Sequence, residues 1–328
     1  MKLPLIIIIV FLVCACKHKP ELKLPVNSAP TAAVKYNDKY YSFFEVDSLN
    51  KDGSSTGLTK KYFYILSDDL KIENKIDLPA NVDGNYNDLF VSHDSILIKN
   101  YHTTTSFYLD EENQKWKEIK FADDVVFEDE DYYITALDFG EWGSRIWFRD
   151  KKTGVVYEMA SYFAPEIAKL NGAYYIITNT NIDIVINPHK LKISTKKSRY
   201  NYLRKDPYKL FSYNGYPNQG VTKVYEGDAL KAESGKFFIA KSFIKNGQLQ
   251  YIVAEDCKVY IATINKGKLI STSILDEEMY IYSSPGFFRN RYLNQALAFY
   301  SATNKVYGYI EIKKGNLALH YLKSLKAK

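Results

Sequence analysis

The sequence predicts an all-β fold, and three observations support this prediction. The chain of 328 residues contains 29 Tyr and 18 Phe, which favour the pleated surface of a sheet over a helical bundle. Short runs of bulky apolar residues recur along the chain, and a turn precedes each of them. Several of the polar turns between these runs contain a glycine, as hairpin turns with a positive φ angle require.

The recurring unit is a turn, a bulky doublet or triplet, a second apolar run and a polar turn. The doublets begin at Tyr40, Leu89, Tyr132, Tyr174, Phe237 and, less regularly, Leu297. Three intervals are 49, 43 and 42 residues long, whereas the later intervals of 63 and 60 residues leave room for an insertion or an unrecognised unit. Four short strands in about 40–45 residues is the repeat length of a propeller blade. We therefore expect a single β-propeller of six or seven blades, with two packed β-sandwich-like domains as the alternative.

Glycine marks three of the expected hairpin turns, within residues 149–156, 264–270 and 312–319. The glycines in question are Gly154, Gly267 and Gly315. Only two segments suggest helices. Residues 161–172 end at Gly172, and residues 226–235 end at Gly235.

The first sixteen residues indicate export. After Met1 and Lys2, residues 3–13 form an apolar segment that is too short to span a bilayer, which takes about 20 residues, so we interpret it as a secretory signal. The sequence Val13-Cys14-Ala15-Cys16 resembles the lipobox of bacterial lipoproteins, in which a small residue precedes the modified cysteine. This resemblance implies cleavage before Cys16, a diacylglycerol on its sulfur and an acylated amino terminus. An ordinary cleaved signal and an uncleaved anchor are the alternatives.

The chain then divides into a signal peptide at residues 1–15, a tether at residues 16–31 and a propeller-like domain at residues 32–328. Prolines at positions 20, 25 and 30 give the tether a semi-extended character. The expected location is an exported, membrane-anchored lipoprotein, in the outer membrane or facing the periplasm of a two-membrane cell. Lys17 instead of Asp favours the outer membrane in families that sort by this position.

Cysteine usage excludes an intrachain disulfide in the mature chain. Cys14 would leave with the signal and Cys16 would carry lipid, so that only Cys257 remains. Cys257 lies in phase with Val259 and Ile261, which predicts a cysteine buried in the core.

The net charge of +6 comes mainly from Lys, and Arg is rare, which argues against nucleic acid as a partner. One segment, residues 189–209, is strongly basic and interleaved with Tyr. It could contact anionic headgroups or an acidic glycan, or it could be a solvated connection between blades. The residues of this basic patch are Lys196, Lys197, Arg199, Arg204 and Lys205.

The most distinctive stretch for ligand binding is residues 137–150. Gly140 and Gly143 bracket a loop in which Trp142 could stack on a sugar or an aromatic ligand. In the alternative interpretation, this tryptophan packs over the hairpin and the neighbouring arginines stack on a second tryptophan. The candidate binding residues are Asp138, Glu141, Trp142, Arg145 and Trp147.

No catalytic residue can be assigned from the sequence. Asp138 and Glu141 could form the carboxylate pair of a glycoside hydrolase, but polar loops often hold such pairs. Metal-ligand spacings and glycine-rich phosphate loops are absent, so we expect neither a metal nor a cofactor. The expected function is a non-enzymatic binding or scaffold module for a glycan, a peptide or a protein of the cell envelope. A carbohydrate-active propeller enzyme, either a glycoside hydrolase or a lyase, is the alternative.

Overall fold

The computed structural model describes residues 22–25, 28–49, 55–82, 87–92, 94–100, 105–119, 125–138, 144–161, 166–194, 219–281 and 295–326. The signal peptide, Cys16, the loop with Glu141 and Trp142, and the basic patch lie outside these residues. The predictions made for them therefore remain predictions.

Almost all described elements are antiparallel strands, in six sets of four. The first set contains β1 (Ser28–Tyr36), β2 (Lys39–Leu49), β3 (Ser55–Ser67) and β4 (Ile72–Ile76). The second contains β5 (Asn87–Ser92), β6 (Ser95–Asn100), β7 (Ser106–Asp110) and β8 (Lys115–Ile119). The third contains β9 (Val125–Glu128), β10 (Tyr132–Asp138), β11 (Ser144–Asp150) and β12 (Val156–Ser161).

The second half of the chain continues the series. The fourth set contains β13 (Glu166–Leu170), β14 (Ala173–Ile177), β15 (Asn181–Val185) and β17 (Thr222–Glu226). The fifth contains β18 (Phe237–Lys245), β19 (Gln248–Glu255), β20 (Lys258–Asn265) and β21 (Lys268–Asp276). The sixth contains β22 (Met279–Ile281), β23 (Gln295–Ser301), β24 (Val306–Lys313) and β25 (Asn316–Lys326). The remaining elements are β16 (Lys192–Ile193), α2 (Ala229–Glu233), η1 (Ala80–Val82) and η3 (Pro188–Lys190).

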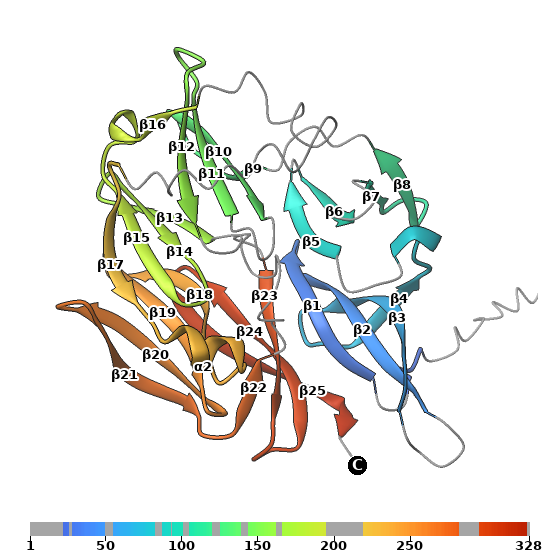
Figure 1. Cartoon of the computed structure of the whole chain (residues 1–328). Helices are drawn as coiled ribbons and strands as arrows, with labels where there is room; N and C mark the ends of the chain where they lie inside the picture. Colours follow the sequence, from blue (N-terminus) through green and yellow to red (C-terminus); the bar gives the residue numbers. More distant parts are fainter. Residues whose placement is uncertain are drawn as a thin grey trace, which may run out of the picture.

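The six sets follow one another around a common centre (Figure 1). The ring closes where β1 of the first set pairs with β23 of the last, through Ala33 opposite Ala296 and Val34 opposite Gln295. The two sets thereby share one sheet, in the order β25-β24-β23-β1-β2-β3-β4, with β22 also on β23. The chain is a β-propeller, and its described residues form six blades.

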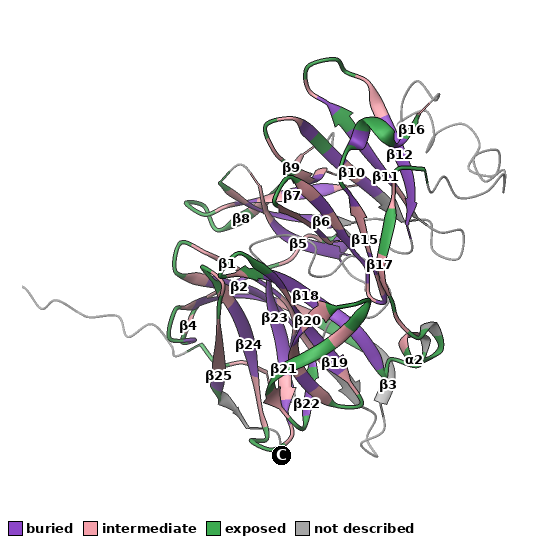
Figure 2. Ribbon diagram, turned by 90° about the vertical axis from the view of Figure 1, so that its left-hand side faces the viewer, coloured by how far each residue is buried: buried purple, intermediate pink, exposed green. Residues whose placement is uncertain are grey.

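Buried residues, purple in Figure 2, run along the strands of the blades. Most of them are apolar and pack where two blades meet. Each of five hydrophobic clusters spans two blades: first and second, third and fourth, fourth and fifth, fifth and sixth, and sixth and first. Between the fourth and fifth blades, for example, Ile177 and Ile182 pack with Tyr251 and Val253. A sheet covered on both faces accommodates continuous apolar runs, because neither face needs to be polar.

The recurring unit of the sequence corresponds to the blade, since each of the six doublets lies in a different blade. Leu89 and Phe237 lie in first strands, and the other four doublets lie in second strands. The intervals between doublets therefore do not measure the length of a blade. The 63-residue interval contains the long connection between Val185 of β15 and Thr222 of β17. Within it, β16 pairs with β12 and adds a fifth strand to the third blade.

The three expected hairpin glycines all have a positive φ, of 71° at Gly154 and 75° at Gly267 and Gly315. The turns between first and second strands, such as those at Asn37 and Asp38 and at Asn246 and Gly247, also have positive φ. Because consecutive blades repeat the same antiparallel order, these first turns lie at one end of the propeller. We call this end the turn side.

The first strand, β1, begins at Ser28 and pairs with β2 there, and Pro30 lies beside a register shift that accommodates its missing N–H. Two expectations were wrong. Residues 166–170 form the strand β13 instead of a helix, since Ile167 is needed in the core between the third and fourth blades. Cys257 is exposed, because it and Asp256 form the tight turn between β19 and β20. The second expected helix is confirmed as α2, capped by the Asp228 carboxylate.

Close packing in the sixth blade depends on a residue without a side chain. A Cβ atom on Gly308 would lie 2.3 Å from the carbonyl oxygen of His320 and 2.5 Å from the ring of Phe299. Strands β24 and β25 therefore approach the Phe299 ring more closely than any larger residue would allow.

Candidate functional site

The stretch predicted to bind ligand forms the expected hairpin of β10 and β11. Asp138 is the last residue of β10 and pairs with Ser144, and the loop of residues 139–143 between the strands lies outside the described residues. Trp147 is only 6% exposed, so burial leaves its ring little surface for a ligand. Arg145 Nη1 lies 3.8 Å from Glu158 Oε1 of the neighbouring strand β12. The structure thus brings Arg145 together with Glu158, and Glu158 is not among the binding residues predicted from the sequence.

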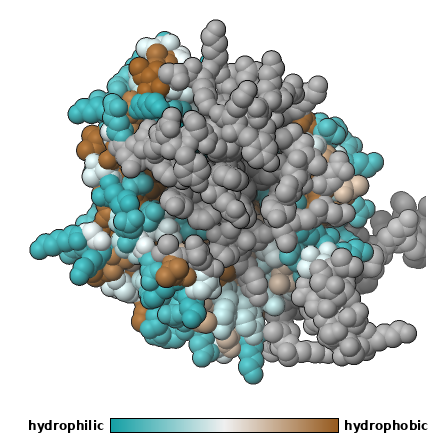
Figure 3. Space-filling model, in the orientation of Figure 1, coloured by the Kyte–Doolittle hydropathy of each residue, from teal (hydrophilic) through white to brown (hydrophobic). Residues whose placement is uncertain are grey.

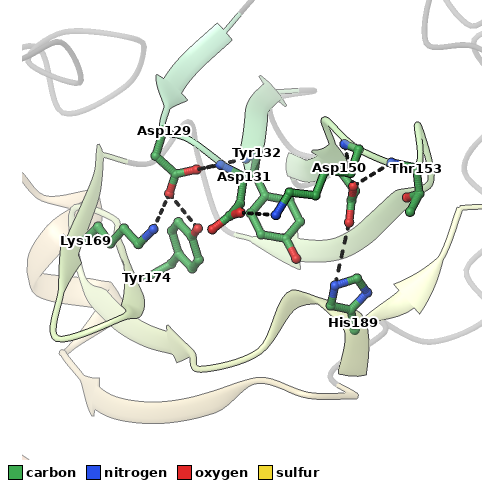
Figure 4. Close-up of polar contacts among 9 residues, drawn as sticks. Asp129, Asp131, Tyr132, Asp150, Thr153, Lys169, Tyr174 and His189 are labelled. Carbon is green, nitrogen blue, oxygen red and sulfur yellow. Dashed lines mark hydrogen bonds and ion pairs between the residues drawn. The ribbon is translucent and has the colours of Figure 1, made fainter.

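A polar cluster joins the third and fourth blades on the turn side (Figure 4). Asp129, at the turn between β9 and β10, accepts hydrogen bonds of 2.6 Å from Lys169 Nζ and from Tyr174 Oη. Its other oxygen accepts the backbone N–H groups of Asp131 and Tyr132. Although burial acts in the opposite direction, these bonds hold the pKa of Asp129 below its ordinary value. One carboxylate oxygen thus joins the two blades and the other holds the turn between β9 and β10, which indicates a structural role.

A second contact in the same view positions His189. Its Nε2 lies 3.6 Å from Asp150 Oδ2 (Figure 4). Its Nδ1 lies 2.6 Å from the Tyr157 hydroxyl. His189 belongs to η3, and its backbone N–H donates to the Asn187 side chain, which caps this short helix. These contacts fix the start of the long β15–β17 connection against the third blade, next to the pairing of β16 with β12.

A buried ion pair links the innermost strands of the fourth and fifth blades. Lys241 Nζ of β18 lies 3.6 Å from Glu166 Oε1 of β13, and their side chains are 2% and 10% exposed. Glu166 Oε2 also accepts a 2.7 Å hydrogen bond from the Ser242 backbone N–H. Burial raises the pKa of Glu166 and lowers that of Lys241, while the charge of each partner opposes the shift.

Between the same two blades, a cavity of about 510 Å³ lies on the turn side. Its wall from the fourth blade consists of Leu170, Tyr175, Ile184 and Val224. The fifth blade contributes residues of β19, β20 and the turn before β19: Gly247, Gln248, Leu249, Tyr251, Thr263, Ile264 and Asn265. We call this space the interblade cavity.

Tyr251 connects the interblade cavity with the ion pair. It lines the cavity and is 1% exposed, and its burial, followed by the neighbouring Tyr175 and the charge of Glu166, raises the pKa of its hydroxyl. Local sequence gave no sign of this region, because Glu166 and Lys241 belong to different blades and match no motif. The available signal is weak, because Glu166 begins a strand that also contains Lys169, and Lys241 lies in a strand that also contains Lys245.

Within the described residues, no group of three or more His, Cys, Asp or Glu side chains could hold a metal ion. None of the helices in the described ranges has the length and apolar character of a bilayer-spanning segment.

Neither a family model nor a curated protein matches this chain. Several solved structures resemble it at very low sequence identity. Dihydro-heme d1 dehydrogenase NirN is 9% identical over 90% of this chain and 66% of that chain, with a TM-score of 0.37. The GH32 β-fructofuranosidase BmSUC1 of Bombyx mori is 9% identical over 92% of this chain and 64% of that chain, with a TM-score of 0.28. YCF48 from Cyanidioschyzon merolae is 7% identical over 84% of this chain and 93% of that chain, with a TM-score of 0.31.

The chain spans about two thirds of the length of the first two of these structures. Such distant likenesses carry no argument about activity, although enzymes are among the neighbours. The assignment of the propeller rests on the strand order of this chain.

Proposed function

We propose that this protein is an exported, lipid-anchored propeller that binds a ligand of the cell envelope in the interblade cavity. The observation that carries the binding proposal is the cavity itself, which combines apolar walls, two tyrosines and two side-chain amides at a gap between blades. Ligand sites in proteins commonly have this composition, with an apolar lining and a few polar groups that fix orientation. The anchor is proposed from the sequence at Cys16 alone.

Binding is tested with the full-length chain in lipid nanodiscs, screened against glycan and peptide arrays. Tyr175→Ala removes a ring from the cavity wall, and we expect the affinity for any ligand found to fall about tenfold or more, as for a buried aromatic contact. Tyr280→Ala is the matched control, because Tyr280 is 48% exposed in the sixth blade. Equal affinity of the Tyr175→Ala variant and the parent chain would locate binding elsewhere.

The anchor is tested by mass spectrometry and membrane fractionation of Cys16→Ala. We expect the parent chain to carry the mass of the acyl groups and to sediment with membranes, and the variant to lose both properties. Identical mass and fractionation of the two chains would exclude lipidation at this residue.

A second candidate function, a carbohydrate-active hydrolase, is favoured by one observation. Glu166 lies on an innermost strand beside the cavity, and its raised pKa is what a general acid requires. Its described partner is an ammonium group, whereas glycoside hydrolysis uses a second carboxyl group. Turnover of an oligosaccharide that Glu166→Gln abolishes without loss of binding would establish this function in place of simple binding.

A further inference from the structure

The strand next to the interblade cavity is an edge strand among the residues that the structure describes. β17 is the last described strand of the fourth sheet, whose order is β13-β14-β15-β17. Its residue Val224 interrupts the pairing with β15, because Ile182 pairs with Tyr225 while the next residue, Asp183, pairs with Lys223. Val224 also lines the cavity. An edge strand beside a pocket is the arrangement by which proteins capture extended peptides: the edge pairs with the peptide backbone and the pocket takes a side chain.

The walls of the cavity suit an apolar side chain. The fourth blade lines the cavity with Leu170, Tyr175 and Ile184, and the fifth blade with Leu249 and Ile264. All of these except Ile184 belong to the hydrophobic cluster between the two blades or pack against it. Against these apolar side chains a sugar would bury hydroxyl groups, and each hydroxyl left unpaired would weaken its binding. An aliphatic or aromatic side chain carries no such cost.

The mouth of the cavity is positively charged. Two hairpin turns of the fifth blade flank it, and a Cβ on Gly267 in the second turn would lie 3.7 Å from the Val224 carbonyl oxygen of β17. These turns, residues 245–248 and 265–268, contain Lys245, Lys266 and Lys268 and no acidic residue. In Figure 3, long hydrophilic side chains project at the left-hand edge, where Figure 1 places β17 and β21. A partner that approaches this mouth is favoured if it is acidic.

We infer that the interblade cavity docks an extended peptide, which adds to β17 as a further strand, inserts one apolar side chain between the blades and carries acidic residues opposite the lysines. This inference rests on the proposed binding function and names its ligand class. We expect the cavity wall to determine which peptides bind, and the lysines to raise the association rate constant of acidic peptides.

The test is a selection of phage-displayed random dodecapeptides on the full-length chain in nanodiscs. We expect the selected peptides to share an apolar residue next to Asp or Glu. Tyr175→Ala should weaken their binding about tenfold or more, and Lys266→Glu should weaken it several-fold and reduce its dependence on salt. Lys305→Glu is the control, because Lys305 also has a positive φ, of 53° against 48° at Lys266, but lies in the turn between β23 and β24, at the end of the propeller opposite the turn side.

Each outcome decides between the inference and its alternatives. A selection without binders, or peptides whose affinity is the same for the parent chain, Tyr175→Ala and Lys266→Glu, overturns the peptide inference. If a glycan or an acyl chain binds instead and Tyr175→Ala abolishes that binding, the cavity remains the ligand site and only the peptide inference fails. If Tyr175→Ala affects no ligand of any class, the proposed binding function fails as well.

Discussion

The buried ion pair between the fourth and fifth blades allows a quantitative prediction. Lys241→Met removes the ammonium group and keeps a side chain of similar length, which leaves the Glu166 carboxylate buried at 10% exposure with the Ser242 N–H as its described hydrogen-bond donor. Loss of one partner of a buried pair costs about 3–5 kcal/mol, because the remaining charge is no longer compensated. Since Lys241 itself is 2% exposed, we expect a loss in this range of the free energy of unfolding.

The double variant Glu166→Gln with Lys241→Met should recover much of this loss. Its neutral amide still accepts the hydrogen bond of the Ser242 N–H, and no uncompensated charge remains. Replacement of both members of a buried pair by neutral groups is often close to neutral in stability, so we expect the double variant to be more stable than Lys241→Met by about 2 kcal/mol or more.

Urea unfolding followed by tyrosine and tryptophan fluorescence measures both variants. Lys231→Met is the control, because the Lys231–Glu255 pair has the same chemistry at 3.0 Å but with side chains that are 46% and 34% exposed. An exposed pair contributes about 0–1 kcal/mol. The reasoning is refuted if Lys241→Met costs no more than Lys231→Met, or if the double variant is less stable than the single one.

Three further changes test other contacts. Gly308→Ala should destabilise the fold by about 1–3 kcal/mol in urea unfolding, because the added Cβ overpacks against Phe299. Gly154→Ala is the control, because no atom lies within 4 Å of its added Cβ and only backbone strain is expected. Equal losses of stability in the two variants would contradict the packing argument. Tyr309→Phe should cost about 1–3 kcal/mol, because the buried Ser42 hydroxyl loses a 2.8 Å bond at the junction of the first and sixth blades; an unchanged unfolding midpoint would argue against this bond. Asp129 has a lowered pKa in the folded protein, so its contribution is complete above its unfolded pKa of about 4 and is lost as the pH falls through the lower folded value. Asp129→Asn should therefore destabilise most at pH 7 and progressively less below pH of about 4, and a loss that is constant from pH 7 to pH 2 would contradict this assignment.

Local sequence was sufficient for the propeller class and for most of the strands and turns, but it left the number of blades at six or seven. Aromatic doublets such as Tyr132 and Tyr133 stand at the start of strands, and glycines such as Gly267 stand where φ is positive, because both preferences act over a few residues. Cys257 was misplaced for the same reason. Its alternation with Val259 was real, but the strand begins one residue later, and a turn that could not be recognised without its partner strand exposes the thiol.

The candidate site could not be predicted in this way, because its residues meet only after the blades have packed. Glu166 lies in a segment that was expected to be helical, and Lys241 lies in an apolar strand with no acidic residue nearby in sequence. Their pairing depends on the position of β13 beside β18, which no local preference encodes. Burial of Trp147 likewise depends on Glu158 and its neighbours across the sheet, whereas the loop that holds Trp142 remains a prediction.

The pairing of β1 with β23 has a consequence for biosynthesis. During translation β1 is synthesised early and β23 late. The edge of β1 that pairs with β23 therefore lacks its partner strand until translation is almost complete. Chains that stop before Gln295 keep an open sheet edge on β1, and an open edge favours aggregation and proteolysis.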